Sequence, residues 1–299
     1  MDIKDIFEPE LAGRVRTDLD MSLYTSFKTG GKADLAVFPE SPEELQSFIE
    51  AFDKNGIDYI TLGNCTNVLV SDEGIRGAVL FTSGLKGLSV EDNVITALSG
   101  SLMSETASFA ARHSLSGMEA LNGIPGSVGG GVYMNAGAYD GEVKNILVSV
   151  DAMDRQGNLR RYAAEDASLS YRHSIFSENG ETIVRARFAL SEGEEKEIRS
   201  RMSDYNARRR EKQPLEYPSA GSTFKRPEGY YAGALIEQSG LKGASVGGAM
   251  VSEKHAGFII NKGSATSADI LNLIEHVRET VYQHFGVMLE PEIKMIGRM

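Results

Sequence analysis

The sequence lacks the marks of several protein classes. It has one cysteine among 299 residues, which excludes an intrachain disulfide and suits a reducing compartment, so a cytoplasmic protein is expected. Its five histidines are scattered, and with a single cysteine they predict no metal site. No apolar run reaches the length that a bilayer requires, and the first residues lack a signal-peptide pattern. We therefore expect no membrane insertion.

Basic residues are also few relative to acidic ones. The chain has 31 Lys and Arg against 42 Asp and Glu, a net charge of −11. Because nonspecific nucleic-acid binding needs a basic surface, no nucleic-acid partner is expected. Anionic small molecules need only a local cluster and stay possible as ligands. The length allows two or three domains, and we expect a monomer.

Glycine is concentrated in the segment 123–139, where six of seventeen residues are glycine. Since glycine loses the most backbone freedom on ordering, this run is predicted to form neither a stable helix nor an ordinary strand. Its main-chain N–H groups are instead expected to approach an anionic cofactor. The alternative is a flexible linker, but Ile124 and Pro125 are apolar or stiff. No Rossmann or P-loop pattern is present, so another fold must hold any nucleotide.

The pattern of apolar residues predicts alternating helices and strands. A strand at 34–38, a helix capped by Ser41 and a strand at 57–62 form a predicted β-α-β unit. Residues 59–70 are predicted to form a strand, a tight turn and a second strand. The remaining predictions are short strands over 78–98, helices at 101–116, 192–212, 231–239 and 267–285, a hairpin of 146–153 with 158–162, and strands at 182–190, 256–260 and 292–296.

Two segments that contain glycine, 59–70 with Gly63 and 123–139, resemble the flavin-binding turns of the MurB family, the UDP-N-acetylenolpyruvoylglucosamine reductases. The resemblance runs from about residue 24 to residue 297. Seven further segments match in the same order along the chain: 171–176, 212–214, 221–225, 232–237, 240–243, 254–258 and 286–293. Each segment alone is a weak signal, but the ordered set is specific to the family.

The resemblance implies an α+β fold. A two-part FAD-binding domain of the PCMH or vanillyl-alcohol-oxidase type would span 20–212 and divide into two α/β subdomains near residue 80. An N-terminal segment, 1–19, would precede it, and a smaller α/β substrate domain, 213–299, would follow Gln213-Pro214. The implied reaction is NADPH-dependent, FAD-mediated reduction of UDP-N-acetylglucosamine enolpyruvate to UDP-N-acetylmuramate. That reaction serves peptidoglycan synthesis, and through it cell wall biogenesis, cell shape, the cell cycle and cell division.

The residues implied to bind FAD all lie in the two turns. They are Gly63, Asn64, Cys65, Thr66, Asn67, Gly123, Ile124, Pro125, Gly126, Ser127, Gly129, Gly130, Asn135 and Ala136. Cys65 stands where the family more often has glycine. Covalent flavin attachment through this thiol is conceivable, but a small buried side chain is the favoured interpretation.

Three residues are implied to be catalytic. From the sequence alone, Arg172 could form a surface salt bridge or hold a carboxylate through two parallel hydrogen bonds. Ser222 could be a turn serine or part of a Ser-x-x-Lys acylation motif, whose partner motifs are missing. The resemblance makes Arg172 the group that stabilises charge on the substrate carboxylate, Ser222 the proton donor and Glu292 the catalytic acid. Glu290 would share a strand face with Glu292 but has no family counterpart.

The resemblance also implies that Lys225, Arg226 and Lys242 bind substrate. One or both of the lysines would neutralise its diphosphate, whereas Arg226 replaces an asparagine common in the family. The segment between 176 and 189 is too short for the aromatic-bearing loop of one branch, so the chain resembles the shorter branch. Two other functions stay open: an FAD-dependent oxidase of another sugar or alcohol, and a nucleotide-sugar-binding protein without flavin.

Overall fold

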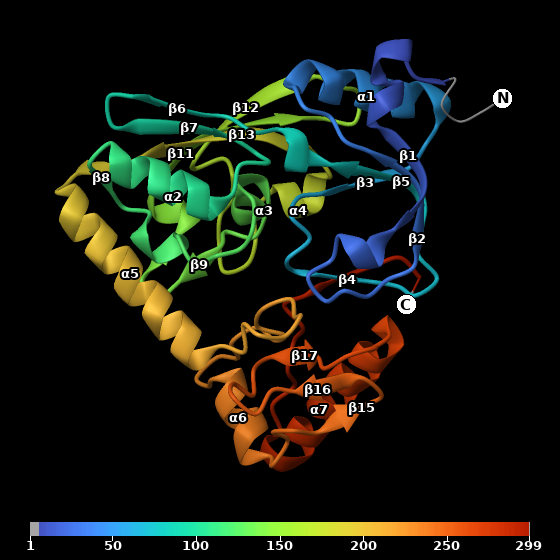
Figure 1. Cartoon of the computed structure of the whole chain (residues 1–299), viewed down its shortest axis with the longest axis vertical. Coiled ribbons are helices and arrows are strands. Elements are labelled where there is room, and N and C mark those ends of the chain that lie inside the picture. The colour runs from blue at the N-terminus through green and yellow to red at the C-terminus, as the bar shows by residue number, and fades with distance from the viewer. Residues whose placement is uncertain (1–5, 299) are drawn as a thin grey trace. The chain divides into compact units, whose positions relative to one another are not determined.

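The computed structural model describes residues 6–298 (Figure 1). Residues 1–5 of the predicted N-terminal segment, and Met299, lie outside the described residues. The described chain divides into two compact units. Unit 1 contains the residues up to Thr17, Leu35–Asn64 and Gly77–Ala207, and unit 2 contains Asp18–Asp34, Cys65–Arg76 and the residues from Arg208 onward. Each unit is assembled from segments that are distant in the sequence, so the two units cannot be compared directly with a single cut in the chain. The predicted domain boundary between residues 212 and 213 therefore stays a prediction.

The first sheet has the strand order β1-β2-β5-β3, formed by Val15–Asp20, Lys32–Val37, Ile75–Phe81 and Tyr59–Leu62. Helix α1, Pro42–Asn55, begins as predicted at Ser41, whose Oγ accepts a hydrogen bond from the Glu44 N–H at 3.2 Å. It ends at Gly56, which has the left-handed conformation that suits glycine. Strand β3 pairs in parallel with β5, so β5 lies between the two strands of the predicted β-α-β unit.

The second sheet is antiparallel and lies wholly in unit 1. Its order is β12-β11-β13-β7-β6, formed by Leu159–Ala163, Leu147–Met153, Thr182–Ala189, Val94–Leu98 and Leu88–Glu91. Helices α2, Met103–Arg112, and α3, Val128–Tyr133, lie beside this sheet (Figure 1) and share one apolar core with it. The remaining short elements of unit 1 are β8 (Leu115–Ser116), β9 (Gly137–Ala138), β10 (Gly141–Glu142), α4 (Phe176–Asn179), β14 (Ser191–Glu192) and 3-10 turns at Pro9–Arg14, Thr82–Gly84, Glu119–Leu121 and Val143–Asn145.

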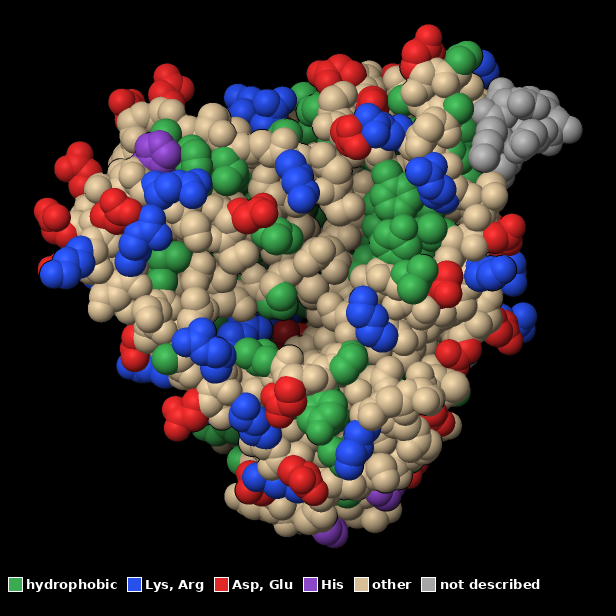
Figure 2. All heavy atoms as spheres, viewed as in Figure 1, with side chains coloured by type: hydrophobic (Ala, Val, Ile, Leu, Met, Phe, Trp, Pro, Cys, Tyr) green, Lys and Arg blue, Asp and Glu red, His purple; other side chains and the backbone are tan. Residues whose placement is uncertain are grey.

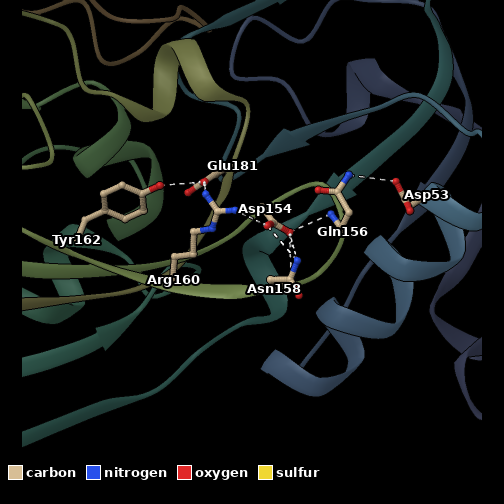
Figure 3. Close-up of polar contacts among 7 residues, drawn as sticks. All are labelled: Asp53, Asp154, Gln156, Asn158, Arg160, Tyr162 and Glu181. Carbon is tan, nitrogen blue, oxygen red and sulfur yellow. Dashed lines mark hydrogen bonds and ion pairs between the residues drawn. The ribbon is translucent and has the colours of Figure 1, made fainter.

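The predicted hairpin of β11 and β12 is confirmed, and one carboxylate shapes its turn (Figure 3). Asp154 Oδ1 accepts hydrogen bonds from the N–H groups of Gln156 and Asn158, both at 2.9 Å. Arg160 Nη2 lies 3.0 Å from Asp154 Oδ2, and its Nη1 lies 3.7 Å from Glu181 Oε1. An aspartate stabilises a tight turn in this way, because its carboxylate accepts hydrogen bonds from main-chain N–H groups of the turn.

One buried carboxylate holds three arginines on the same sheet. Asp151 of β11 is 1% exposed and pairs with Arg161 at 2.7 Å, Arg185 at 2.9 Å and Arg187 at 3.0 Å. Burial by itself would raise the pKa of Asp151, but the hydrogen bonds and charges of Arg161 and Arg187 lower it to about 2. The carboxylate is therefore ionised at neutral pH and links the neighbouring strands β12, β11 and β13.

The prediction that the glycine-rich run forms no helix is wrong for part of it. Val128–Tyr133 is an α-helix, and Ser127 caps it by accepting from the Gly130 N–H at 3.5 Å. Tertiary packing overrides the poor helix propensity of glycine. A Cβ on Gly129 would lie 2.9 Å from Ser99 Cβ, and one on Gly131 would lie 3.0 Å from Met103 Sδ. The glycines thus let α3 pack closely against its neighbours.

Unit 2 is built around helix α7, Ser267–Phe285, which starts at a Thr266 capping box and stops at Gly286 as predicted. Around it lie α6 (Ala232–Gln238), the sheet β15-β16-β17 (Ser245–Val246, Ala249–Val251 and Ile259–Asn261), the parallel pair of β4 (Val68–Val70) with β18 (Lys294–Ile296) and a 3-10 turn at Met21–Leu23. Helix α5, Glu195–Lys212, runs through the boundary at residue 207. The final two strands begin at 259 and 294, later than the predicted 256 and 292.

Candidate functional site

The two segments predicted to bind FAD meet within unit 1. Asn64 Nδ2 donates a hydrogen bond to the Pro125 carbonyl at 2.7 Å. A Cβ on Gly63 would lie 2.3 Å from Ser127 Oγ, so only glycine allows this close approach. The structure therefore brings Gly63 and Asn64 against the start of the glycine-rich run, where Ile124, Pro125 and Ser127 lie.

These turns fit the phosphate groups of FAD. Among the described residues of unit 1, the main-chain N–H groups of Asn64 and Gly126 donate to no protein acceptor. Unpaired N–H groups in glycine-bearing turns are suited to oxyanions such as a pyrophosphate. Farther along, the N–H of Ala136 donates to the Gly131 carbonyl at 2.7 Å, so its main-chain donor is already used.

Cys65 is buried and has a φ of 49°, a left-handed conformation. Burial raises the pKa of its thiol to about 12. The thiol is thus protonated at neutral pH, whereas covalent bond formation needs the thiolate. This supports the interpretation of Cys65 as a small buried side chain.

Arg172 lies at the tip of a tight turn in unit 1. Ser170 and His173 exchange two main-chain hydrogen bonds, both 3.2 Å long, with Tyr171 and Arg172 between them. Arg172 has a φ of 57°, which is strained for a residue other than glycine, and such strain is concentrated at functional sites. Its guanidinium lies 4.9 Å from the centroid of the Tyr171 ring, and Nη2 donates to the Gly137 carbonyl at 3.4 Å.

Buried polar side chains tie this turn to the glycine-rich run. Ser174, fully buried, donates from Oγ to the Tyr133 carbonyl at 2.8 Å, and Asn135 Nδ2 donates to the Ser170 carbonyl at 3.0 Å. Sequence reasoning missed Ser174, because nothing in the sequence marks which serine is buried. Its place in the segment 171–176 was the one available signal.

Ser222 and Glu292 lie on neighbouring extended segments of unit 2. The N–H of Glu292 donates to the Thr223 carbonyl at 2.8 Å, and an antiparallel bridge joins Phe224 to Pro291. Thr223 is buried, and its Oγ1 accepts from the Ile259 N–H at 3.0 Å. Ser222 is exposed, and its hydroxyl contacts no other polar group of the described chain. The hydroxyl is therefore free to contact a substrate.

The first of the two turns predicted to bind FAD also contacts these segments. Asn67 Nδ2 donates to the Glu292 carbonyl at 3.2 Å, and the Lys294 N–H donates to the Asn67 carbonyl at 2.9 Å. Three predicted site residues, Asn67, Ser222 and Glu292, are thus brought together in unit 2. Arg172 belongs to unit 1.

The three cations predicted to bind substrate each have a partner in unit 2. Lys225 forms an ion pair with Glu290. Lys242 Nζ lies 2.6 Å from Glu237 Oε1. The Arg226 guanidinium lies 4.0 Å from the centroid of the Tyr231 ring. The Glu290 carboxylate therefore serves as the ion-pair partner of Lys225. This differs from the role predicted for Glu292, which is that of catalytic acid.

Charges of both signs are interspersed on the face shown in Figure 2. The described part of the chain holds no group of three or more His, Cys, Asp or Glu residues placed to bind a metal ion. None of the helices described is both long and apolar enough to span a membrane.

Comparison with known proteins identifies the family. Residues 33–163 match the FAD binding domain family, and residues 213–296 match the UDP-N-acetylenolpyruvoylglucosamine reductase C-terminal domain. The reductase of Clostridium novyi is 50% identical over 283 residues, which cover 95% of this chain and 92% of the relative. The chain belongs to the UDP-N-acetylenolpyruvoylglucosamine reductase family. The family's enzyme from Caldanaerobacter subterraneus is 48% identical, with 95% and 94% covered.

Solved structures agree with this family membership. The reductase of Thermus caldophilus matches with a TM-score of 0.81 and 34% identity, over 95% of this chain and 98% of that one. A glucose dehydrogenase, Phl p 4.0202, matches 63% of this chain and 42% of that one with a TM-score of 0.51 at 15% identity, which supports the fold alone. The predicted α+β fold with an FAD-binding domain is confirmed, and the protein is an FAD-dependent oxidoreductase. The oxidase and flavin-free alternatives are not favoured.

Proposed function

We propose that Arg172, Ser222 and Glu292 carry out the family's reaction in this protein, the reduction of UDP-N-acetylglucosamine enolpyruvate to UDP-N-acetylmuramate with NADPH as reductant. The observation that carries this function is the 50% identity to a UDP-N-acetylenolpyruvoylglucosamine reductase across 95% of the chain. We further propose that the protein acts as a cytoplasmic monomer in peptidoglycan synthesis, and thereby serves cell division.

Bound FAD would carry a hydride from NADPH to the terminal carbon of the enolpyruvyl group. Negative charge then develops on the conjugated carboxylate of the substrate. The Arg172 guanidinium would hold that carboxylate through two parallel hydrogen bonds, which arginine can form and lysine cannot. A preorganised cation at the site of developing charge is among the largest contributions to catalysis.

Ser222 would donate the proton from Oγ to the carbon next to the hydride acceptor. Its exposed hydroxyl and its firmly held neighbour Thr223 support this assignment, because the backbone fixes where the hydroxyl sits. Glu292, in its protonated form, would hydrogen-bond the substrate carboxylate. The nearby Asn67 would help to hold the Glu292 main chain.

Substrate phosphates would be bound by the cations of unit 2. Lys225 and Lys242 are paired with exposed glutamates, and exposed pairs of this kind are weak enough to be shared with a ligand. Arg226, stacked on Tyr231, presents a planar fork suited to phosphate oxygens.

The function is tested by the flavin spectrum of the purified protein. Anaerobic NADPH should bleach the visible flavin absorbance, and UDP-N-acetylglucosamine enolpyruvate added afterwards should restore it with formation of UDP-N-acetylmuramate. Oxygen supplied alone should restore it more slowly than the substrate does. If the enolpyruvyl compound leaves the reduced flavin unchanged while oxygen reoxidises it rapidly, the protein is an oxidase and this proposal is wrong.

A further inference from the structure

The β9–β10 hairpin lies next to the Arg172 turn and contacts it in two ways. Gly137 of β9 pairs with Glu142 of β10, and the Gly137 carbonyl accepts from Arg172 Nη2 at 3.4 Å. The second contact runs through the side chain of Asn135. The hairpin therefore touches both the guanidinium and the main chain of the turn that carries it.

Asn135 is fully buried, and its amide is almost fully hydrogen-bonded. Nδ2 donates to Glu142 Oε2 at 2.9 Å and to the Ser170 carbonyl at 3.0 Å, while Oδ1 accepts from the Lys144 N–H at 2.9 Å. Both amide protons are thus used. Any contact of Asn135 with FAD must therefore involve its main chain or the second lone pair of Oδ1. The side-chain NH₂ group cannot donate to the cofactor as well.

Glu142 is one of three groups that fix which way this amide points. The Glu142 carboxylate and the Ser170 carbonyl accept from the NH₂ end, and the Lys144 N–H donates to the oxygen. The second proton then points at the Ser170 carbonyl, two residues before Arg172. Glu142 is half-buried, with 27% of its side chain exposed, and hydrogen bonds to a charged acceptor are about twice as strong as neutral ones. Its other oxygen lies 2.7 Å from Lys144 Nζ.

We propose that Glu142 is a positioning residue for Arg172. Its carboxylate helps to hold the Asn135 amide, Asn135 holds Ser170, and the turn is thereby kept in the conformation that presents the guanidinium. Strained turns persist only when the surrounding structure holds them. The inference rests on the proposed role of Arg172 in substrate reduction.

Three variants distinguish the effect of the hydrogen bond from Asn135 to Glu142 from the effect of the ion pair between Glu142 and Lys144. Glu142→Ala removes both the acceptor for Asn135 and the pair with Lys144. Glu142→Gln removes the charge but keeps an oxygen that can accept from Asn135. Lys144→Ala removes the ion pair alone, since the Lys144 main-chain N–H remains. Lys144 is exposed, so its pair contributes little.

The first readout is the separation of the two half-reactions. Glu142→Ala should slow flavin reoxidation by the enolpyruvyl substrate by about 10- to 100-fold, the range expected when a catalytic group is misplaced by about 1 Å. Flavin reduction by NADPH should change by less than about threefold, because it does not use the Arg172 contact. Lys144→Ala should stay within about threefold of the unaltered protein in both steps. Glu142→Gln should be slowed less than Glu142→Ala, because its side-chain oxygen can still accept from Asn135.

The second readout needs neither substrate nor turnover. Amide hydrogen exchange of the peptide that spans 168–176 should be faster in Glu142→Ala than in Glu142→Gln or Lys144→Ala, because the cross-turn bonds of Ser170 and His173 open more often. If the unaltered protein does not reduce the enolpyruvyl compound, the proposed function fails, while this exchange experiment still tests the positioning of the turn.

The proposal is overturned if Glu142→Ala matches Lys144→Ala in both readouts. It is also overturned if Glu142→Ala slows both half-reactions equally, or if exchange rises throughout unit 1, because a general loss of folding would then explain the result. Selective loss of substrate reduction, with faster exchange confined to 168–176 and recovery in Glu142→Gln, supports it.

Discussion

Replacing Ser222 by alanine should separate the two half-reactions. The change removes one exposed hydroxyl that contacts no other polar group of the described chain. The free energy of unfolding should therefore change by no more than about 0.5 kcal/mol. Thr223 keeps the neighbouring main chain in place, so the substrate site should keep its shape.

The expected loss follows from the missing proton donor. A positioned acid contributes about 10²- to 10⁴-fold in rate, which corresponds to about 3–5 kcal/mol of transition-state stabilisation at 1.36 kcal/mol per tenfold change. Flavin reduction by NADPH uses no proton from this position and should stay within about threefold of the unaltered protein.

Stopped-flow absorbance measures this step directly. Pre-reduced protein is mixed with UDP-N-acetylglucosamine enolpyruvate without oxygen, and recovery of flavin absorbance is followed. Ser245→Ala, which removes another exposed serine hydroxyl of unit 2, serves as the matched control. Reoxidation of Ser222→Ala at the unaltered rate would refute the proton-donor role. Collapse of flavin reduction instead would mean that Ser222 shapes the flavin or NADPH site.

Four further predictions test the site and the fold. Heat-denatured protein should release yellow FAD into the supernatant, because the Cys65 thiol, with a pKa of about 12, is not a nucleophile at neutral pH; flavin retained on the precipitate, but not in Cys65→Ser, would contradict this. Arg172→Lys should lower the rate of substrate reduction by at least about tenfold although the charge is kept, and near-normal kcat would make the contact merely electrostatic. Gly63→Ala should weaken FAD retention, because its Cβ would meet Ser127 Oγ at 2.3 Å, whereas Gly13→Ala, with nothing within 4 Å, should not. Asp151→Asn should lower the free energy of unfolding by about 2–3 kcal/mol at pH 7, the equivalent of a pKa depressed from 3.8 to about 2; this difference should shrink as the pH falls from about 4 through about 2, and a pH-independent difference in urea denaturation would contradict the assignment.

Several features of the candidate site could be read from the sequence. The two turns predicted to bind FAD contain glycine and asparagine, whose conformational freedom marks close main-chain approach, and the Asn64–Pro125 contact joins them as segments. The cap at Ser41 and the stop at Gly286 were also visible, because helix ends depend on local chemistry. The family followed from ordered motifs.

Other features depend on residues that are distant in the sequence. The helix at Val128–Tyr133 forms against glycine propensity because Gly129 and Gly131 pack without a gap on Ser99 and Met103. Likewise, Glu292 is located by Thr223 and Asn67 rather than by a regular strand. Neither outcome is encoded in the local sequence.

The sequence by itself determined the family, the acidic character and the residues that could react. Only the tertiary structure decided which carboxylate serves which cation and which buried amide holds the Arg172 turn. The reason is physical: propensity, capping and turn preference act over a few neighbouring residues. Burial and hydrogen-bond partnership, by contrast, are set by groups such as Glu142, Asn135 and Ser170 that meet only after the chain has folded.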